Sequence, residues 1–213
     1  MSTRRKNALI LPIAVGTIGM MVAALFFGSA AKNGYEVGDS ATDFKLKNVD
    51  GRTVSLTDWK DAKGFIVVFD CNTCPVSRKY NERIMALNKR YASKGFPLIA
   101  INPNSPELSA GDSFDEMAKY AKKKGYDFPY LYDETQRVVN EFGATNTPHV
   151  FVLNREGKDL KVAYIGAIDD SASDASKATR RYVEEAVDAL LAGKAVQTSR
   201  TKAIGCSVKL KNS

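Results

Sequence analysis

Two cysteines separated by two residues, Cys71 and Cys74, are the side chains of this sequence best suited to chemistry. A cysteine reacts as its thiolate, and the N-terminus of a helix lowers the pKa of a thiol. Pro75 directly follows Cys74, and proline favours the first position of a helix. Cys74 would then be the N-cap residue, beside unpaired backbone N–H groups and the positive end of the helix dipole. We therefore expect Cys74 to be the nucleophile, with two inert structural thiols in a buried turn as the alternative.

The segments on either side of these cysteines have the patterns of a buried strand and an amphipathic helix. Residues 65–69 are continuously apolar, as in a strand that is buried on both faces. After Pro75, apolar side chains recur at spacings of three and four, which predicts a helix that ends at Gly95. Residues 97–101 form a second apolar run. A strand, a helix and a second strand in this order predict a β-α-β unit.

The rest of the chain continues the alternation of strands and helices. Helices are expected at residues 114–121, 135–142 and 178–191, and strands at residues 44–46, 53–55, 150–153 and 162–165. This order predicts an α/β domain whose central mixed β-sheet is flanked by helices on both faces. We place this domain at residues 32–193. A polar C-terminal tail, residues 194–213, carries the third cysteine, Cys206.

The N-terminal segment has the features of an export signal. Residues 7–31 carry no charge and follow the basic residues Arg4, Arg5 and Lys6. The run is long enough to cross a membrane, and the small residues at its end also fit a cleaved signal peptide. We expect residues 1–31 to form a hydrophobic helix that is either a signal peptide or a membrane anchor. Either would place the domain in the periplasm or on the outer face of the inner membrane, where cysteine pairs can be oxidised.

The composition excludes several classes of protein. The chain has 213 residues, of which 44% are hydrophobic, so it is long enough to bury a core. Three cysteines are too few for a disulfide scaffold, and a single histidine excludes a site with several histidine ligands. The net charge of +7 is not gathered into a basic stripe with interleaved aromatic residues, so no nucleic-acid partner is expected.

Several motifs occur along the chain in the order that one family shows. They are residues 69–75 (FDCNTCP), 102–104 (NPN), 128–134 (FPYLYDE), 144–151 (ATNTPHVF), 164–170 (YIGAIDD) and 204–209 (IGCSVK). In these motifs the chain resembles the thioredoxin-like redoxin family, the alkyl hydroperoxide reductase and thiol-specific antioxidant group, and within it a peroxiredoxin-like branch. The resemblance covers residues 35–210 and implies a thioredoxin-like fold.

The resemblance also implies roles for individual residues. Counting five residues from the last aromatic residue of the preceding strand places the nucleophile at Cys74, whereas aligning the Cys-x-x-Cys letters directly would place it at Cys71. In the first alignment, Ser77 stands where the resolving cysteine is usual. Pro148 matches the cis-proline that thioredoxin folds present opposite the nucleophile. The backbone of Thr147, directly before it, is expected to pair with an extended thiol substrate.

With Ser77 in the usual resolving position, two other thiols are candidates for that role. Cys71 is close in sequence, although so short a loop restricts the geometry of a disulfide. Twelve residues separate Gly193 from Cys206, and an extended tail of that length can return to the site. Gly205 would permit the sharp backbone turn that a close approach requires. Both cysteines therefore remain candidates, and Cys206 can also be a spare thiol.

Departures from the family pattern bear on which activity is expected, and they argue against a peroxidase. Members with peroxidase activity carry a threonine where this chain has Cys71 and a proline where it has Val67. The buried acid of thioredoxins is replaced by Val68, and Asp70 is expected to point differently. The expected function is therefore an exported thiol–disulfide oxidoreductase, in which the Cys74 thiolate exchanges disulfides with a protein or a small-molecule thiol.

Two other functions are kept as alternatives. The first is a thiol peroxidase, in which peroxide oxidises Cys74 and the product condenses with Cys71 or Cys206. The second is a copper(I) carrier with Cys71, Cys74 and His149 as soft ligands. His149 can alternatively tune or deprotonate a thiol. The leading function requires no cofactor and no metal, and a membrane is a partner only through an uncleaved N-terminal helix.

Overall fold

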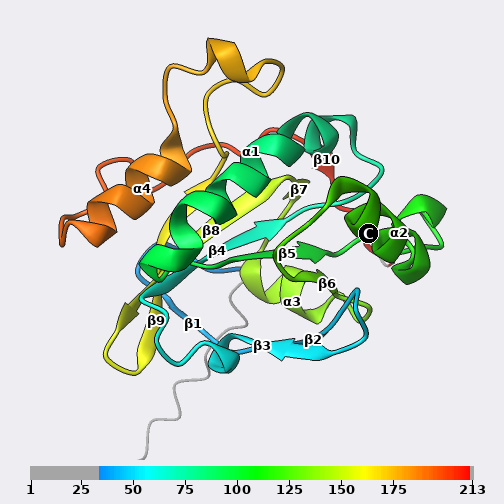
Figure 1. The fold of residues 1–213 in the computed structure, drawn as a ribbon, viewed down its shortest axis with the longest axis horizontal. Coiled ribbons are helices and arrows are strands. Elements are labelled where there is room, and N and C mark those ends of the chain that lie inside the picture. The colour runs from blue at the N-terminus through cyan, green and yellow to red at the C-terminus, as the bar shows by residue number, and fades with distance from the viewer. Residues whose placement is uncertain (1–33, 212–213) are drawn as a thin grey trace, which may run out of the picture. The chain divides into compact units, whose positions relative to one another are not determined.

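The computed structural model describes residues 34–211, and its main element is an eight-stranded mixed sheet with the order β1-β9-β8-β4-β5-β6-β2-β3 (Figure 1). A separate two-stranded sheet joins β7 and β10. The strands are β1 (Ser40–Ala41), β2 (Lys45–Asn48), β3 (Thr53–Ser55), β4 (Gly64–Phe69), β5 (Leu98–Asn102), β6 (Tyr130–Tyr132), β7 (Asn146–Thr147), β8 (His149–Glu156), β9 (Asp159–Gly166) and β10 (Cys206–Ser207).

Four α-helices accompany the sheet within residues 34–211. They are α1 (Pro75–Tyr91), α2 (Phe114–Lys124), α3 (Arg137–Phe142) and α4 (Tyr182–Leu191), with 3-10 turns at Leu56–Asp58, Ala92–Lys94, Ala110–Asp112 and Ala175–Lys177. The helix predicted for residues 1–31 lies outside the described residues. Within the described range, no helix combines the length and the apolar character needed to cross a membrane.

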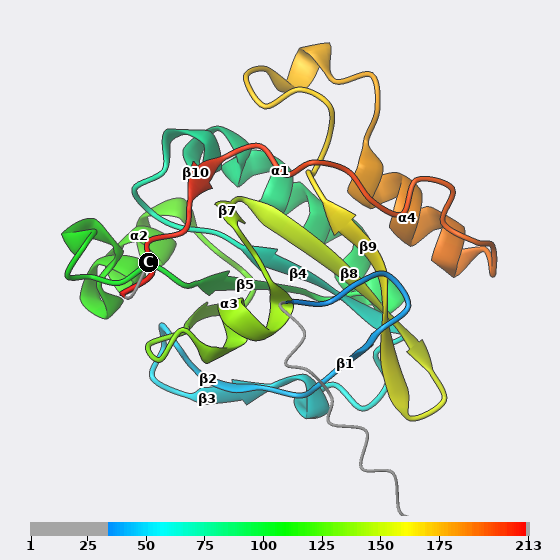
Figure 2. The same cartoon turned by 180° about the vertical axis from the view of Figure 1, so that it is seen from behind.

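The sheet is covered on both faces, as predicted, because its central strands are buried on both sides. On β4, Ile66 and Val68 pack with α1, α2 and α4 in one hydrophobic cluster. Phe65, Val67 and Phe69 point the other way and pack with α3 in a second cluster. The two views of the molecule show α1 and α3 on opposite faces of the sheet (Figures 1 and 2).

The predicted β-α-β unit is confirmed. Strands β4 and β5 pair in parallel, and α1 connects them. The helix itself ends at Tyr91, and a 3-10 turn continues to Gly95. The loop between the end of β4 and the start of α1, residues 70–74, carries both cysteines at the carboxyl edge of the central strands.

The last helix begins later than predicted, at Tyr182 rather than near Ala178. The Asp170 carboxylate explains the difference, because it accepts hydrogen bonds from the backbone N–H and the hydroxyl of Thr179. The backbone N–H of Asp170 also donates to the carbonyl of Arg180 at 3.2 Å. These bonds hold residues 178–181 in a non-helical connection before α4.

Candidate active site

Cys74 is the N-cap residue of α1, as the sequence predicts. Pro75 occupies the first turn, and the backbone N–H of Ser77 points at Cys74 Sγ across 3.5 Å. Cys74 is buried, with 2% of its surface exposed. Its sulfur therefore lies at the positive end of the helix dipole, where a thiolate is stabilised.

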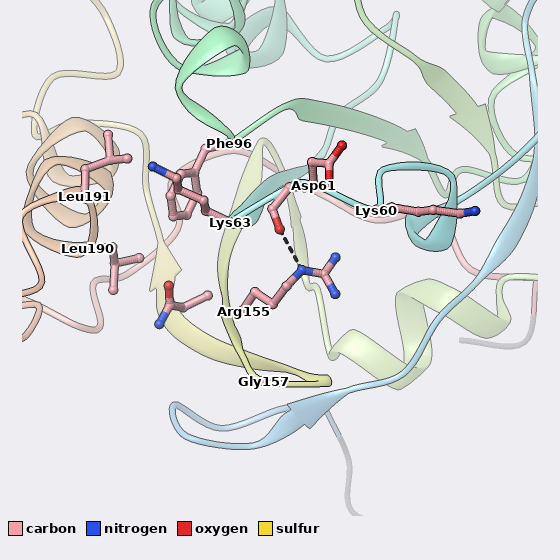
Figure 3. Close-up of a pocket in the computed structure, with 10 residues that line it drawn as sticks. Lys60, Asp61, Lys63, Phe96, Arg155, Gly157, Leu190 and Leu191 are labelled. Carbon is pink, nitrogen blue, oxygen red and sulfur yellow. Dashed lines mark hydrogen bonds between the residues drawn. The ribbon is translucent and has the colours of Figure 1, made fainter.

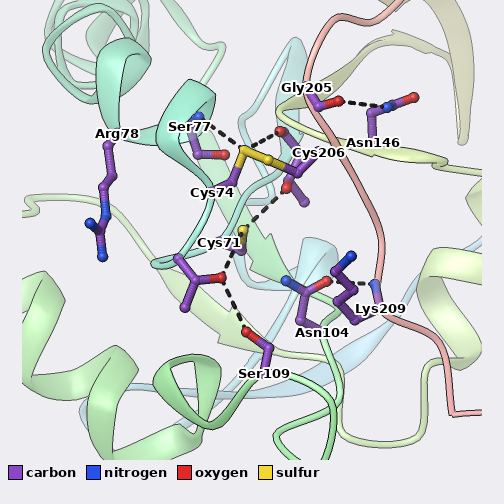
Figure 4. Close-up of a disulfide and its surroundings, with 12 residues drawn as sticks. Cys71, Cys74, Ser77, Arg78, Asn104, Ser109, Asn146, Gly205, Cys206 and Lys209 are labelled. Carbon is purple, nitrogen blue, oxygen red and sulfur yellow. Dashed lines mark hydrogen bonds between the residues drawn. A yellow bond between two sulfur atoms is a disulfide. The ribbon is translucent and has the colours of Figure 1, made fainter.

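A disulfide joins Cys74 to Cys206, and the two Cα atoms are 5.9 Å apart (Figure 4). Cys206 is only partly buried. It reaches Cys74 because the tail forms β10, which pairs antiparallel with β7. The structure thus brings together the predicted nucleophile and the more distant of the two candidate resolving thiols.

Thr147 contacts both cysteines of the loop. Cys74 Sγ lies 3.2 Å from the Thr147 carbonyl oxygen, and Cys71 Sγ lies 3.1 Å from the Thr147 hydroxyl oxygen. The peptide bond between Thr147 and Pro148 is cis, as the resemblance implied. The predicted substrate-binding pair therefore lies directly against the thiols.

Cys71 is a free thiol in an environment that disfavours its charged form. Burial raises the pKa of Cys71, and the negative charges of Asp112 and Asp70 raise it further. The Thr147 hydroxyl acts in the opposite direction but does not outweigh them. Cys71 is therefore a protonated thiol at neutral pH.

Asp112 fixes the loop that carries the cysteines, a role that the sequence reasoning missed. Its carboxylate accepts hydrogen bonds from the backbone N–H groups of Asn72 (2.7 Å) and Thr73 (3.3 Å), and from the hydroxyls of Thr73 and Ser109. Burial alone would raise the pKa of Asp112, but bonds from Thr73, Asn104 and Ser109 hold it below its usual value. Apart from its place in a Ser/Gly-rich loop before α2, the sequence offers no signal for this residue.

Asp70 is a buried acid close to the cysteines, although Val68 stands where thioredoxins carry their buried acid. Strand β4 ends at Phe69, so the alternation of a strand does not govern the direction of Asp70. Burial raises the pKa of Asp70 to about 6, with the Ser77 hydroxyl acting in the opposite direction. Neither Asp70 Oδ1 nor Ser77 Oγ has a hydrogen bond of ordinary geometry.

His149 is held in its neutral form. Burial lowers its pKa to about 4, and the charge of Arg200 lowers it further. The Nδ1 atom accepts a hydrogen bond from the backbone N–H of Thr145 at 3.3 Å, and the ring packs on Phe151. Between residues 34 and 211, no three His, Cys, Asp or Glu side chains gather as a metal site would require, so the geometry gives the copper alternative no support.

The tail is attached to the domain on both sides of Cys206. Upstream, Ser199 and Thr201 form backbone hydrogen bonds of 3.0 Å with Ile165, at the end of β9. Downstream, the Lys209 backbone N–H donates to the Asn104 side chain at 2.9 Å. These contacts flank Cys206 and do not involve the disulfide.

A pocket lies away from the thiols. It has a volume of about 520 Å³ and is bordered by the start of β4, the β8–β9 turn and the end of α4 (Figure 3). Arg155 lies in it and donates to the Ala62 carbonyl at 2.6 Å. Because the cysteines lie beyond the opposite end of β4, this pocket is not part of the candidate site.

Comparisons with known proteins identify relatives of this chain. ResA, a thiol-disulfide oxidoreductase of Geobacillus thermodenitrificans, is 28% identical over 156 residues, which are 73% of this chain and 84% of that protein. The solved structure of an uncharacterized conserved protein from Geobacillus kaustophilus is 39% identical, with a TM-score of 0.78, over 85% of this chain and 95% of that one.

The fold and the family are shown by two further matches. The thioredoxin domain of a thiol-disulfide oxidoreductase from Bacteroides vulgatus has a TM-score of 0.50 at 18% identity, over 62% of this chain and 91% of that one. This likeness shows a thioredoxin-like fold. A model of the AhpC/TSA family matches residues 37–164, which are more than half of the sequence. The chain belongs to the AhpC/TSA family.

Proposed function

We propose that this protein is a thiol–disulfide oxidoreductase in which Cys74 is the nucleophile and Cys206 the resolving thiol. The disulfide between these two residues is the observation that carries the proposal. The activity class agrees with the relatives named thiol-disulfide oxidoreductase ResA. Its partners are accordingly protein or small-molecule thiols and disulfides.

The reaction proceeds by two exchanges. The Cys74 thiolate attacks one sulfur of a substrate disulfide, forms a mixed disulfide and releases the first substrate thiolate. The Cys206 thiolate then attacks Cys74 Sγ and releases the second substrate thiolate, which leaves the Cys74–Cys206 disulfide. The substrate gains two electrons and the enzyme loses two. Run in reverse, the same steps oxidise a dithiol.

The surroundings of the cysteines support this assignment of roles. Cys74 lies at a helix N-terminus, which favours a thiolate, whereas the pKa of Cys71 is raised by burial and by two carboxylates. Cys206 is held within disulfide distance of Cys74 by contacts on both sides. Cys71 instead contacts the Thr147 hydroxyl.

We also propose that the protein is exported. The uncharged run of residues 7–31 after three basic residues supports this location, because such segments direct the downstream part of a chain outward. An oxidising compartment would then maintain the disulfide between exchanges.

Peptide mapping after reaction of the reduced protein with cystine tests the assignment of the thiols. We expect a linked Cys74–Cys206 peptide and an alkylatable Cys71. The Cys206→Ser variant should accumulate a mixed disulfide on Cys74, whereas the Cys71→Ser control should form the internal disulfide normally. A linked Cys71–Cys74 peptide with a freely alkylated Cys206 would contradict the proposal. Consumption of hydrogen peroxide faster than of cystine would favour the peroxidase alternative.

A further inference from the structure

The tail lies where an extended substrate would lie. Strand β10 pairs antiparallel with β7, with Cys206 opposite Thr147 and Ser207 opposite Asn146. Its cysteine is bonded to the nucleophile, as the cysteine of a substrate would be in a mixed disulfide. Beneath the tail, Thr147 has no exposed surface. The oxidised protein therefore displays its own substrate site with a peptide strand bound in it.

Most of the contacts around Cys206 come from the backbone of the tail. The Asn146 side-chain amide donates to the Gly205 carbonyl at 3.0 Å, and the Val208 backbone N–H donates to the Thr145 carbonyl at 3.0 Å. The side chains of Ile204 and Ser207 are exposed, with Ile204 at 47%, whereas Val208 packs against the second hydrophobic cluster. Any extended peptide could make the same backbone contacts.

Gly205 is the exception, because no other residue fits at its position. A Cβ atom there would lie 2.1 Å from the Thr147 carbonyl oxygen and 2.6 Å from the carbonyl carbon. The obstacle is backbone of the site, which cannot move aside like a flexible side chain. Gly205 does not have a positive φ, so its requirement arises from this close approach and not from a turn.

We propose that the groove of Cys74 and Thr147 selects extended peptides in which glycine directly precedes the reactive cysteine, and that the tail is an exchangeable occupant of this groove. The inference rests on the proposed function and adds the substrate class. Selectivity arises because a peptide with any larger residue before its cysteine collides with the Thr147 carbonyl. The cysteine supplies the bond to Cys74, and the exposed side chains at positions 204 and 207 contribute little.

A symmetric peptide disulfide, made of two copies of the same peptide, is the simplest substrate for the first exchange. The Cys74 thiolate attacks one peptide sulfur, a bond forms between Cys74 Sγ and that sulfur, and the bond between the two peptide sulfurs breaks. The second peptide leaves as a thiolate with the electron pair. The rate of release of this peptide thiol therefore measures the first exchange, whatever resolves the mixed disulfide later.

The test uses the full chain with Cys206 replaced by serine, so that no thiol of the tail competes for Cys74. Two peptide disulfides are compared, one of Ala-Ile-Gly-Cys-Ser-Val, the sequence of residues 203–208, and one with alanine in place of glycine. They react with Cys206→Ser, in which the tail still occupies the groove, and with Gly205→Ala/Cys206→Ser, in which the added methyl group displaces it. Ile204→Ala/Cys206→Ser is the matched control, because Ile204 is exposed. Cystamine, a disulfide without a peptide backbone, reports the intrinsic reactivity of Cys74.

Replacing glycine by alanine should slow release of the peptide thiol when the change is in the peptide and accelerate it when the change is at position 205 of the tail. Alanine in the peptide should slow release about tenfold or more, because the clash is moved to the substrate. Alanine at position 205 of the tail should accelerate release from the glycine peptide, whereas the Ile204 control should react like Cys206→Ser. Equal rates for the two peptides, with cystamine reacting normally, would overturn this inference and leave the proposed function intact. Failure of Cys74 to react with any of the disulfides would overturn both.

Discussion

Cys71 and Cys74 are three positions apart, yet their sulfur atoms meet different groups. The sulfur of Cys74 lies at the start of α1 and faces a backbone N–H, whereas Cys71 lies near two carboxylates. The helix dipole stabilises negative charge at the first sulfur, and the carboxylates destabilise it at the second. One short loop thus holds two thiols with opposite tendencies to ionise.

The reduced protein should therefore show two classes of thiol in alkylation. We expect Cys74 to react with iodoacetamide well below the pH at which Cys71 reacts, because only the thiolate is the nucleophile. Rates measured site by site from pH 5 to about 10 by mass spectrometry give the comparison. Cys71→Ser should retain the rapidly reacting thiol and Cys74→Ser should lack it. The reverse result would assign the nucleophile to Cys71.

The ionisation of His149 and that of Asp70 change the free energy of unfolding in opposite directions as the pH falls. The pKa of His149 falls to about 4 in the folded protein, so between pH 6.5 and 4 the unfolded chain binds a proton that the folded one does not. Stability is then lost as the pH falls. The pKa of Asp70 rises to about 6, so the folded protein binds the extra proton between pH 6 and 4, and stability is gained as the pH falls.

Replacing His149 should make the contribution of Asp70 to the pH dependence of stability measurable. In His149→Gln, the free energy of unfolding should no longer lose the roughly 3 kcal/mol that His149 removes between pH 6.5 and 4. The variant should instead become more stable as the pH falls, and this gain should be smaller in His149→Gln/Asp70→Asn. Urea denaturation at several pH values checks this. An unchanged slope in His149→Gln would show that the histidine does not ionise as described.

At the scale of elements, the tail segment before Cys206 is fitted closely to the end of β9. Gly166 has a φ of +149°, and a Cβ atom there would lie 2.2 Å from Thr201 Oγ1 and 2.6 Å from the Thr201 carbonyl oxygen. The Thr201 hydroxyl also accepts a hydrogen bond from the Ala167 backbone N–H at 2.9 Å. This contact fixes the path of the tail toward the site.

A side chain at Gly166 should consequently weaken the disulfide. In Gly166→Ala, we expect the equilibrium between disulfide and dithiol to shift toward the dithiol by about tenfold, because Thr201 and the following tail are displaced. The fraction of linked Cys74–Cys206 in dithiothreitol buffers measures the shift. Gly157→Ala is the control, since Gly157 also has a positive φ but nothing lies within 4 Å of its added Cβ. Equal shifts in both variants would show that backbone strain alone is responsible.

The elements that could be predicted from the sequence are those with a distinctive pattern of residues within the element itself. The apolar run before the cysteines and the proline after them were sufficient for β4, α1 and the N-cap role of Cys74. The path of the tail had no such signal, because β10 has only two residues and pairs with an equally short strand. Asp112 was missed for a related reason, since its bonds to the cysteine loop depend on how two distant loops meet.

At the scale of the whole molecule, location decides which partners the site can meet. The described domain presents its thiols at the carboxyl edge of β4, and the segment expected to direct export, residues 1–31, lies outside the described residues. The oxidation state of the site depends on the compartment, because cytosolic thiols are kept reduced.

A reporter enzyme that is active only outside the cytoplasm tests the export. Fused after Ser213, it should be active with the full chain and inactive when residues 1–31 are removed. Mass spectrometry of the mature protein distinguishes the two forms of signal, because a peptide that contains Arg4 in the membrane fraction indicates an anchor. Activity of a reporter that works only in the cytosol would contradict both forms.

The Cys74–Cys206 bond joins positions 132 residues apart, so it encloses most of the domain in a covalent ring. Closing so long a ring removes about 4–5 kcal/mol of chain entropy from the unfolded state on the polymer model. Oxidation and folding then form one thermodynamic cycle, in which the extra stability of the oxidised protein equals the difference between the free energies of disulfide formation in the unfolded and folded states. Each reduction of the Cys74–Cys206 disulfide during turnover would remove part of this added stability. The lifetime of the protein against unfolding and proteolysis should therefore report how fully its surroundings keep it oxidised, which thermal unfolding with and without a reductant can measure.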